Sequence, residues 1–169
     1  EDRIVVEVNL KKRMRHILWL VCVLMAGLYS CDKLPKNDDL DGMWHLQRIT
    51  HLNATPQVEE DVAPSRIYWS VQLDLLQINS PQQLMYRDEV TGKQTYNAYC
   101  RFNYTGTTLN INKIYLSFDV KDSLLLDPTT QIMEPYGITG CADNFNIESL
   151  GSKQMILVSD TKRLVFRRF

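Results

Sequence analysis

The sequence predicts an all-β domain, an antiparallel meander closed into a barrel or flattened barrel, behind an N-terminal signal segment. After residue 41, apolar residues alternate with polar ones at a period of two, the spacing of a strand with one buried face. Turn-forming pairs separate these runs at intervals of about 8–12 residues. No long stretch repeats apolar residues at the helical period of 3.6. Short strands joined by tight turns favour an antiparallel barrel or sandwich.

The first element is a short apolar run, residues 17–27, preceded by basic side chains. A membrane-spanning helix needs roughly 20 apolar residues, so this run matches the hydrophobic region of a secretory signal instead. Leu28, Ser30 and Cys31 behind it resemble a bacterial lipobox. The resemblance implies that residues 14–30 are a lipoprotein signal peptide and that Cys31 carries acyl chains such as palmitate.

Two further stretches flank this signal. Residues 1–13 stand before Met14 and include three acidic side chains, which the positive flank of a signal peptide does not carry. We interpret them as an over-extended reading frame and leave them out of fold reasoning. Residues 31–41 are polar, charged and proline-bearing, which is typical of a flexible tether. We expect the barrel domain to occupy residues 42–169.

The chain from Cys31 onward carries 14 Lys and Arg residues against 17 Asp and Glu residues, a net charge of −3. This balance excludes the basic surface of a nucleic-acid-binding protein, so we expect no nucleic-acid partner. The length suits one domain with a substantial core. Cys100 and Cys141 are the cysteines left in this domain. Outside the cytoplasm they form either a disulfide bridge or two separate buried thiols.

The strands of the first half follow from these patterns. Residues 58–66 are acidic and interrupted by proline, which indicates a loop or a single helical turn. Residues 69–78 alternate apolar and polar side chains and predict one strand. Residues 99–111 place Tyr-Thr-Gly-Thr between two strand-like runs, which predicts a hairpin.

The second half contains three short strands, residues 145–150, 154–159 and 163–169, separated by Gly-Ser and Asp-Thr pairs that favour turns. Before them lies the longest irregular piece, residues 122–144, with two prolines and two glycines. Loops of that length in a compact domain are often functional. We expect this loop at the open end of the barrel.

The segment LDGMWHLQRI carries a Gly-x-Trp motif that ends at Trp44 and resembles the opening strand of lipocalin-like domains. The ending ESLGSKQMILVSDTKRLVFRRF resembles the last strands of small lipocalin-like lipoproteins of Gram-negative bacteria. The resemblance implies a lipocalin-like barrel whose closed end is plugged by Trp44, with Arg167 or Arg168 over the indole. Strand parity leaves open which arginine turns inward. A guanidinium over an indole contributes roughly 0.5–2 kcal/mol.

Two kinds of binding follow from the resemblance. Classical lipocalins bind small apolar ligands, so the chain is a candidate carrier of a small apolar or amphipathic ligand. Its candidate contacts are Tyr68, Trp69 and Tyr136, of which Tyr136 is the aromatic expected to be exposed. The alternative is a structural or adaptor lipoprotein with a filled barrel, which contacts a protein partner through residues 122–144 or a sheet edge.

The size of the inward side chains decides between these two hypotheses, because an eight-stranded barrel holds a ligand only when they are small. The sequence offers large candidates for the interior: Tyr68, Trp69, Leu73, Leu75, Tyr99, Phe102 and Tyr104.

The sequence lacks the motifs of common enzyme classes, including the Gly-x-Ser-x-Gly elbow and the His-Glu-x-x-His metal motif. His45 and His51 would lie about 20 Å apart on an extended strand, too far to share a metal ion. We therefore expect no catalytic residues, no cofactor and no metal site. Ser123, in Asp-Ser-Leu, resembles the acceptor that some Gram-negative bacteria O-glycosylate. The lipid on Cys31 implies a cell-envelope protein anchored in the outer membrane, facing either the periplasm or the cell surface.

Overall fold

The computed structural model describes residues 36–117, 123–125, 131–140 and 142–169, and for residues 123–125 it describes the backbone alone. The chain divides into two units, Glu1–Leu34 and Pro35–Phe169, and the described residues belong to the second. The strands of its main sheet are β1 (Gly42–His51), β2 (Val58–Asp61), β3 (Tyr68–Gln72), β4 (Leu75–Asn79), β7 (Asn97–Tyr104), β8 (Thr108–Ser117), β9 (Ser123–Leu125), β10 (Asp143–Leu150), β11 (Gln154–Val158) and β12 (Lys162–Arg168). A separate hairpin and three short 3-10 helices complete the described part: β5 (Tyr86–Arg87), β6 (Gln94–Thr95), η1 (Asp38–Leu40), η2 (Ala63–Ser65) and η3 (Glu134–Tyr136).

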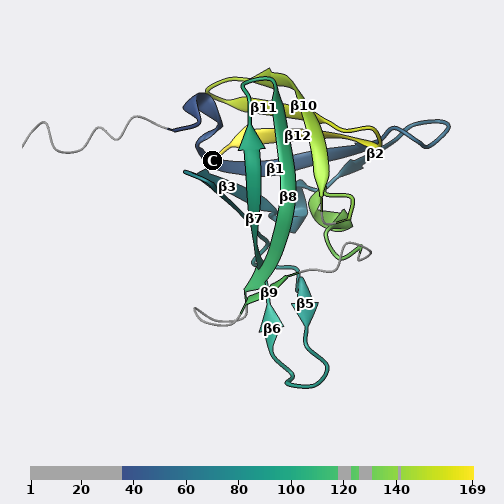
Figure 1. Ribbon diagram of the computed structural model, residues 1–169. Helices are drawn as coiled ribbons and strands as arrows, with labels where there is room; N and C mark the ends of the chain where they lie inside the picture. Colours follow the sequence, from purple (N-terminus) through teal and green to yellow (C-terminus); the bar gives the residue numbers. More distant parts are fainter. Residues whose placement is uncertain (1–35, 118–122, 126–130, 141) are drawn as a thin grey trace, which may run out of the picture. The chain divides into compact units, whose positions relative to one another are not determined.

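Eight of these strands close into an antiparallel barrel (Figure 1). Hydrogen-bonded neighbours follow the order β10-β11-β12-β1-β3-β4-β7-β8, and β8 pairs in turn with β10, so the path returns to its start. Strand β2 pairs with the second half of β1, and β9 pairs with β8. The predicted all-β fold, with an antiparallel barrel as its architecture, is confirmed.

The turn signals located five strands of the described part correctly. The hairpin predicted in residues 99–111 is β7–β8, and the three predicted closing strands are β10, β11 and β12. These strands pair antiparallel with their neighbours, with single register shifts within the β7–β8, β10–β11 and β1–β12 pairs. The sequence pattern therefore identified these five strands and the turns between β7 and β8 and among the three closing strands.

The prediction of one strand over residues 69–78 is wrong, because the chain reverses at Leu73 and forms the hairpin β3–β4. Leu73 has a φ of +55°, a left-handed conformation that a leucine rarely adopts. The reversal shifts the alternation, so that Leu76 and Ile78 are buried while Leu73 and Leu75 are exposed. The expectation that Leu73 and Leu75 fill the interior is corrected accordingly.

Residues 36–41, expected as part of a flexible tether, pack against the barrel instead. Leu40 is completely buried at the end of η1, and Asn37 is buried beside it. The side-chain amide of Asn37 donates to the carbonyl oxygen of Leu73 at 2.8 Å. The packed domain thus begins no later than residue 36. Residues 58–66 also contain more structure than a loop, because β2 precedes the single turn η2.

The core fills the inside of the barrel with large apolar side chains. The largest completely buried residues are Trp44, Trp69, Tyr136, Phe145, Phe166, Leu40, Leu46, Ile49, Ile67, Leu76, Ile78 and Leu109. Trp69 and Phe102 were predicted for the interior and lie there, whereas Tyr68 and Tyr99 are half-buried and alternate with the buried residues of their strands. No helix in the described part of the chain has the length and apolar character needed to cross a membrane.

Candidate functional site

One end of the barrel is closed by Trp44 and η1. The Trp44 ring is fully buried, and its Nε1 donates to the carbonyl oxygen of Leu40 at 2.9 Å. The guanidinium carbon of Arg168 lies 5.0 Å from the centre of the indole. Arg168 also donates to the carbonyl oxygens of Asp39 and Asp41. Arg168, rather than Arg167, therefore covers the plug, and it ties η1 to the last strand.

The glycine at position 42 of the Gly-x-Trp motif is required for a steric reason. Its φ is +129°, and a Cβ atom added there would lie 2.9 Å from Nη2 of Arg168. Only glycine allows the guanidinium to lie this close to the backbone of β1. Arg167 points the other way, with an exposed side chain on the outer face of the sheet.

The opposite end, where β4 ends and β12 begins, is closed by residues 131–140, which we call the stopper segment. Met133, Tyr136 and Ile138 of this segment are buried. Gly137 packs so closely on Leu164 that an added Cβ atom would lie 2.9 Å from its Cδ1 atom. The stopper segment thus fills the end of the barrel at which lipocalin ligands would be expected to enter.

Polar contacts fix the stopper segment in place. The Nε1 atom of Trp69 donates to the carbonyl oxygen of Tyr136 at 3.1 Å, and the Tyr136 hydroxyl donates to the carbonyl oxygen of Gln83 at 3.4 Å. Burial raises the pKa of Tyr136 to about 12. The expectation that Tyr136 is an exposed contact residue is wrong, because its ring is only 1% exposed.

Next to the stopper segment, three aromatic rings pack together in the core of the barrel. The centre of the Trp69 ring lies 5.0 Å from that of Phe166 and 6.1 Å from that of Phe145. All three side chains are buried. Cys100 is buried in the same core. Trp69 therefore packs in the core and holds the stopper segment, and its predicted role as a ligand contact stays a prediction.

A buried lysine lies at the stopper end of the barrel. Lys162 is only 4% exposed, and its Nζ atom donates to the carbonyl oxygen of Glu134 at 3.4 Å. Burial lowers the pKa of Lys162, against the opposing effect of nearby carboxylates. Burial has the opposite effect on a carboxylic acid, and it raises the pKa of Asp143. The Oδ2 atom of Asp143 accepts a hydrogen bond from the backbone of Thr139 at 2.8 Å. Both groups hold backbone atoms of the stopper segment.

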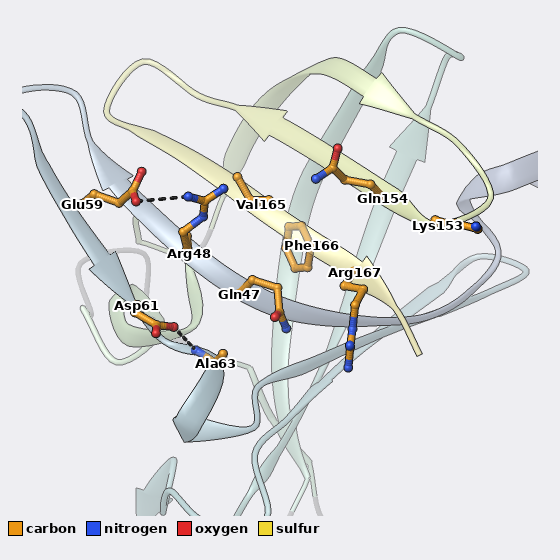
Figure 2. Close-up of a pocket in the computed structure, with 10 residues that line it drawn as sticks. All are labelled: Gln47, Arg48, Glu59, Asp61, Ala63, Lys153, Gln154, Val165, Phe166 and Arg167. Atoms are coloured by element: carbon orange, nitrogen blue, oxygen red, sulfur yellow. Dashed lines mark hydrogen bonds and ion pairs between the residues drawn. The ribbon is translucent and has the colours of Figure 1, made fainter.

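A cavity of about 540 Å³ lies on the outside of the barrel, beside β1 and β12 (Figure 2). We call it the outer groove, and its lining residues are Gln47, Arg48, Glu59, Asp61, Ala63, Lys153, Gln154, Val165, Phe166 and Arg167. Arg48 forms an ion pair with Glu59 at 3.2 Å. Lys153 and Arg167, at the other end of the groove in Figure 2, have no ion-pair partner within the described residues.

The sequence comparison decides the family. Residues 23–169 match the family described as lipocalin-like domain. The chain belongs to the lipocalin-like domain family. Its fold resembles the crystal structure of a lipocalin-like protein from Bacteroides uniformis ATCC 8492, with 18% sequence identity, a TM-score of 0.51, and 78% of this chain and 99% of that chain covered. No curated protein matches this chain significantly.

A second structural match is an uncharacterized protein from Bacteroides eggerthii DSM 20697, with 16% identity, a TM-score of 0.45, and 76% of this chain and 98% of that chain covered. The first match supports the lipocalin-like fold alone, and at 18% identity it leaves the ligand unassigned.

The remaining predicted residues of the lipocalin-like domain lie apart from the stopper segment. Tyr68 stacks on His45, with ring centres 4.8 Å apart, and contacts Phe169 edge-on at 5.3 Å. His51 lies 3.6 Å from a carboxylate oxygen of Glu60. Within the described residues, no group of three or more potential ligands could hold a metal ion. Cys31, Cys141 and the side chain of Ser123 lie outside the described residues, so lipidation, the disulfide and O-glycosylation stay predictions.

Sequence reasoning placed residues 122–144 at one end of the barrel but missed that the stopper segment within them is buried, and it missed the outer groove. The stopper sequence EPYGITG looks like an exposed turn, and its burial depends on Trp69 and Leu164, which are distant in sequence. One residue of the outer groove could have indicated its presence. Val165 is an apolar residue between charged neighbours on the outer face of β12, yet it is buried. An outward apolar residue that is buried indicates that another part of the chain covers the sheet there.

Proposed function

We propose that this lipocalin-like protein is a lipid-anchored lipoprotein of the outer membrane that acts through its outer surface, as an adaptor with a filled barrel. The observation that carries the proposal is the stopper segment. Its apolar side chains occupy the end of the barrel through which a small ligand would enter. Fold membership alone favours the alternative, a small apolar ligand held inside the barrel.

Energetics favour the filled barrel. A ligand inside the barrel would have to displace Met133, Tyr136 and Ile138 of the stopper segment, all of which are buried. Exposing one such side chain costs about 1.5–3 kcal/mol. The ligand would also have to replace the hydrogen bond from Trp69 to Tyr136, because an unpaired buried donor costs about 1–3 kcal/mol. The buried side chains of the stopper segment already make the apolar contacts that a ligand inside the barrel would make.

The outer groove and the edge of β2 are the surface on which a partner fits. Among the described strands, β2 pairs with β1 alone, so its second edge is open. All four residues of β2 are exposed. An open edge can accept an added strand from another chain through backbone hydrogen bonds. The carboxylates of β2 on one side and Lys153 and Arg167 on the other would orient an extended polypeptide that carries both charges.

Site-specific photo-crosslinking in the native host tests this proposal. A photoreactive residue at Gln154, in the outer groove, is compared with one at Arg101, which is exposed on β7 across the barrel. We expect a discrete cross-linked band from residue 154 and none from residue 101. Equal bands from both positions, or none from either, would contradict an adaptor surface at the groove.

An apolar fluorescent probe tests the alternative. We expect that N-phenylnaphthylamine gains no emission with the native chain, because the barrel is filled. A saturable increase in emission, competed away by fatty acids, would favour an interior ligand over the adaptor function.

A further inference from the structure

We propose that the end of the barrel closed by Trp44 and η1 rests on the lipid surface, with Met43, Leu73, Leu75 and Phe169 at the headgroup boundary. The inference rests on the lipid anchor at Cys31 that is part of the proposed function. The inference goes beyond the proposed function because it specifies which face of the domain contacts the membrane. The stopper segment and the β5–β6 hairpin then point away from the bilayer.

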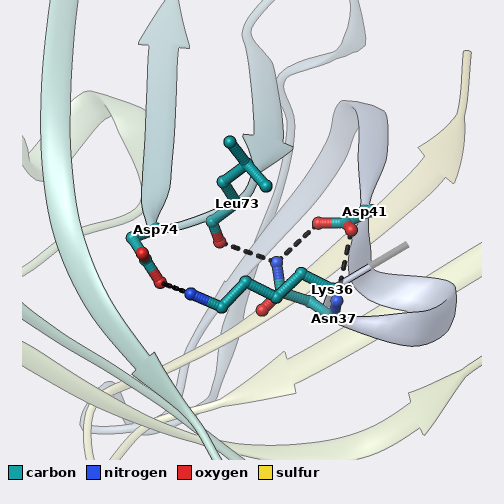
Figure 3. A network of polar contacts seen from close by, with 5 residues as sticks. All are labelled: Lys36, Asn37, Asp41, Leu73 and Asp74. Carbon is teal, nitrogen blue, oxygen red and sulfur yellow. Dashed lines mark hydrogen bonds and ion pairs between the residues drawn. The ribbon is translucent and has the colours of Figure 1, made fainter. Parts of the chain in front are cut away.

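The first argument is the length of chain between the lipid and the first fixed residue. Asn37 is buried and donates hydrogen bonds to Leu73 and Asp41, while Lys36 forms an ion pair with Asp74 (Figure 3). The chain is therefore fixed to the β3–β4 turn at residue 37, six residues after Cys31. Six extended residues span at most about 20 Å.

This reach is short compared with the barrel. A ten-residue strand such as β1 is roughly 33 Å long. A lipid on Cys31 can thus lie close to the β3–β4 turn and to the beginning of β1, but it cannot reach the far end of β1. Figure 1 shows η1 beside the start of β1 and the β5–β6 hairpin at the opposite end. The attachment point selects the Trp44 end as the end nearest the bilayer.

The second argument is the placement of exposed apolar side chains. Leu73 is 57% exposed, Phe169 is 73% exposed, and Met43 and Leu75 are also exposed. All four belong to strand ends or turns at the Trp44 end. Phe169 lies beside Met43, since its backbone donates to the carbonyl oxygen of Met43 at 2.9 Å. Clustered exposed apolar residues mark an interaction surface.

The composition of this end suits a lipid surface. The aromatic ring of Tyr68 contacts Phe169, and amphipathic aromatic rings favour the headgroup region of a bilayer. Asp38 and Asp39 lie at the same end, so the apolar side chains carry the proposal more than the net charge does.

Depth-dependent fluorescence quenching tests the inference on the full lipidated chain. The chain is reconstituted in vesicles of phosphatidylethanolamine and phosphatidylglycerol, with and without lipids brominated near the headgroup. Phe169→Trp places a new fluorophore at the proposed contact. Val90→Trp is the matched control, because Val90 is 95% exposed in the connection between β5 and β6. Both positions are exposed, so neither change disturbs the core.

We expect brominated lipids to quench the added emission of Phe169→Trp and to leave that of Val90→Trp unchanged. Equal quenching of the two variants, or quenching of Val90→Trp alone, would overturn the proposed orientation. If the emission of Phe169→Trp is not quenched although the chain floats with the vesicles, the lipid anchor is present but the Trp44 end does not contact the bilayer. That result would overturn the proposed membrane contact. Dimers formed through Phe169 in that case would identify a second copy as the occupant. A chain that does not float would overturn the anchor and the inference together.

Discussion

At the scale of single residues, the two arginines near the end of β12 show how position decides role. Arg168 covers the Trp44 ring and donates to two carbonyl oxygens before β1. Arg167, one residue earlier, points to the outer groove. The same type of side chain therefore stabilises the fold at position 168 and is exposed to solvent at position 167.

This difference predicts unequal effects of the same substitution. Arg168→Gln should lower the free energy of unfolding by about 2 kcal/mol, because it removes a cation–π contact and charge-assisted hydrogen bonds. Arg167→Gln is the control and should change it by less than about 0.5 kcal/mol. Urea denaturation of both variants measures the difference. Equal losses would mean that Arg168 does not secure the plug.

Tyr136 predicts a dependence of stability on pH. Its pKa is raised by burial from 10.0 to about 12. A raised pKa in the folded state contributes stability that is fully present below pH 10 and is lost as the pH rises toward 12. The free energy of unfolding of the native chain should fall as the pH rises from 10 to 12. That of the Tyr136→Phe variant should fall less over the same range. An identical fall in both chains would show that the hydroxyl of Tyr136 is not buried.

At the scale of elements, the stopper segment depends on Gly137. Its φ is +94° and its Cα lies against Leu164, so alanine there meets both backbone strain and a steric clash. Gly106 has a similar φ of +92° with nothing within 4 Å of an added Cβ atom. Comparing alanine substitutions at Gly106 and Gly137 therefore separates the cost of backbone strain from the cost of the steric clash.

Gly106→Ala should therefore cost about 1–2 kcal/mol from the backbone alone. Gly137→Ala should cost about 1–3 kcal/mol more, the usual penalty of overpacking a core. Thermal or chemical denaturation of the two variants measures the difference. Equal costs would indicate that the stopper segment yields easily, as a gate for a ligand would.

The elements also show what a sequence can predict. Strands β7, β8, β10, β11 and β12 were predicted because glycine or polar pairs mark their turns and their alternation is regular. The β3–β4 reversal was missed because its turn contains a leucine in a left-handed conformation, held by Asn37 from a distant part of the chain. Local patterns report local preferences, whereas this turn is fixed by a tertiary contact.

The candidate site was harder to predict for the same reason. The Trp44 plug follows from a short motif, so its residues could be named from the sequence. The stopper segment and the outer groove bring together residues that are distant in sequence, such as Trp69 with Tyr136 and Asp61 with Lys153. No periodicity within one segment carries information about such contacts.

At the scale of the whole molecule, the lipid anchor is the prediction on which localisation depends. Cys31→Ser should abolish incorporation of radiolabelled palmitate and release the protein from the membrane fraction. Cys100→Ser is the control, because Cys100 is buried in the barrel and should not affect labelling. Labelled acyl chains that still appear on Cys31→Ser would contradict the lipobox.

The central claim is that the barrel is filled by its own side chains and acts through its surface. The most direct test is the native mass of the Cys31→Ser chain, purified from its own host and compared with its denatured mass. We predict that the two masses agree with one chain and no added small molecule. An extra mass that disappears on denaturation would contradict the filled barrel, and its value would begin to identify the ligand that displaces the stopper segment.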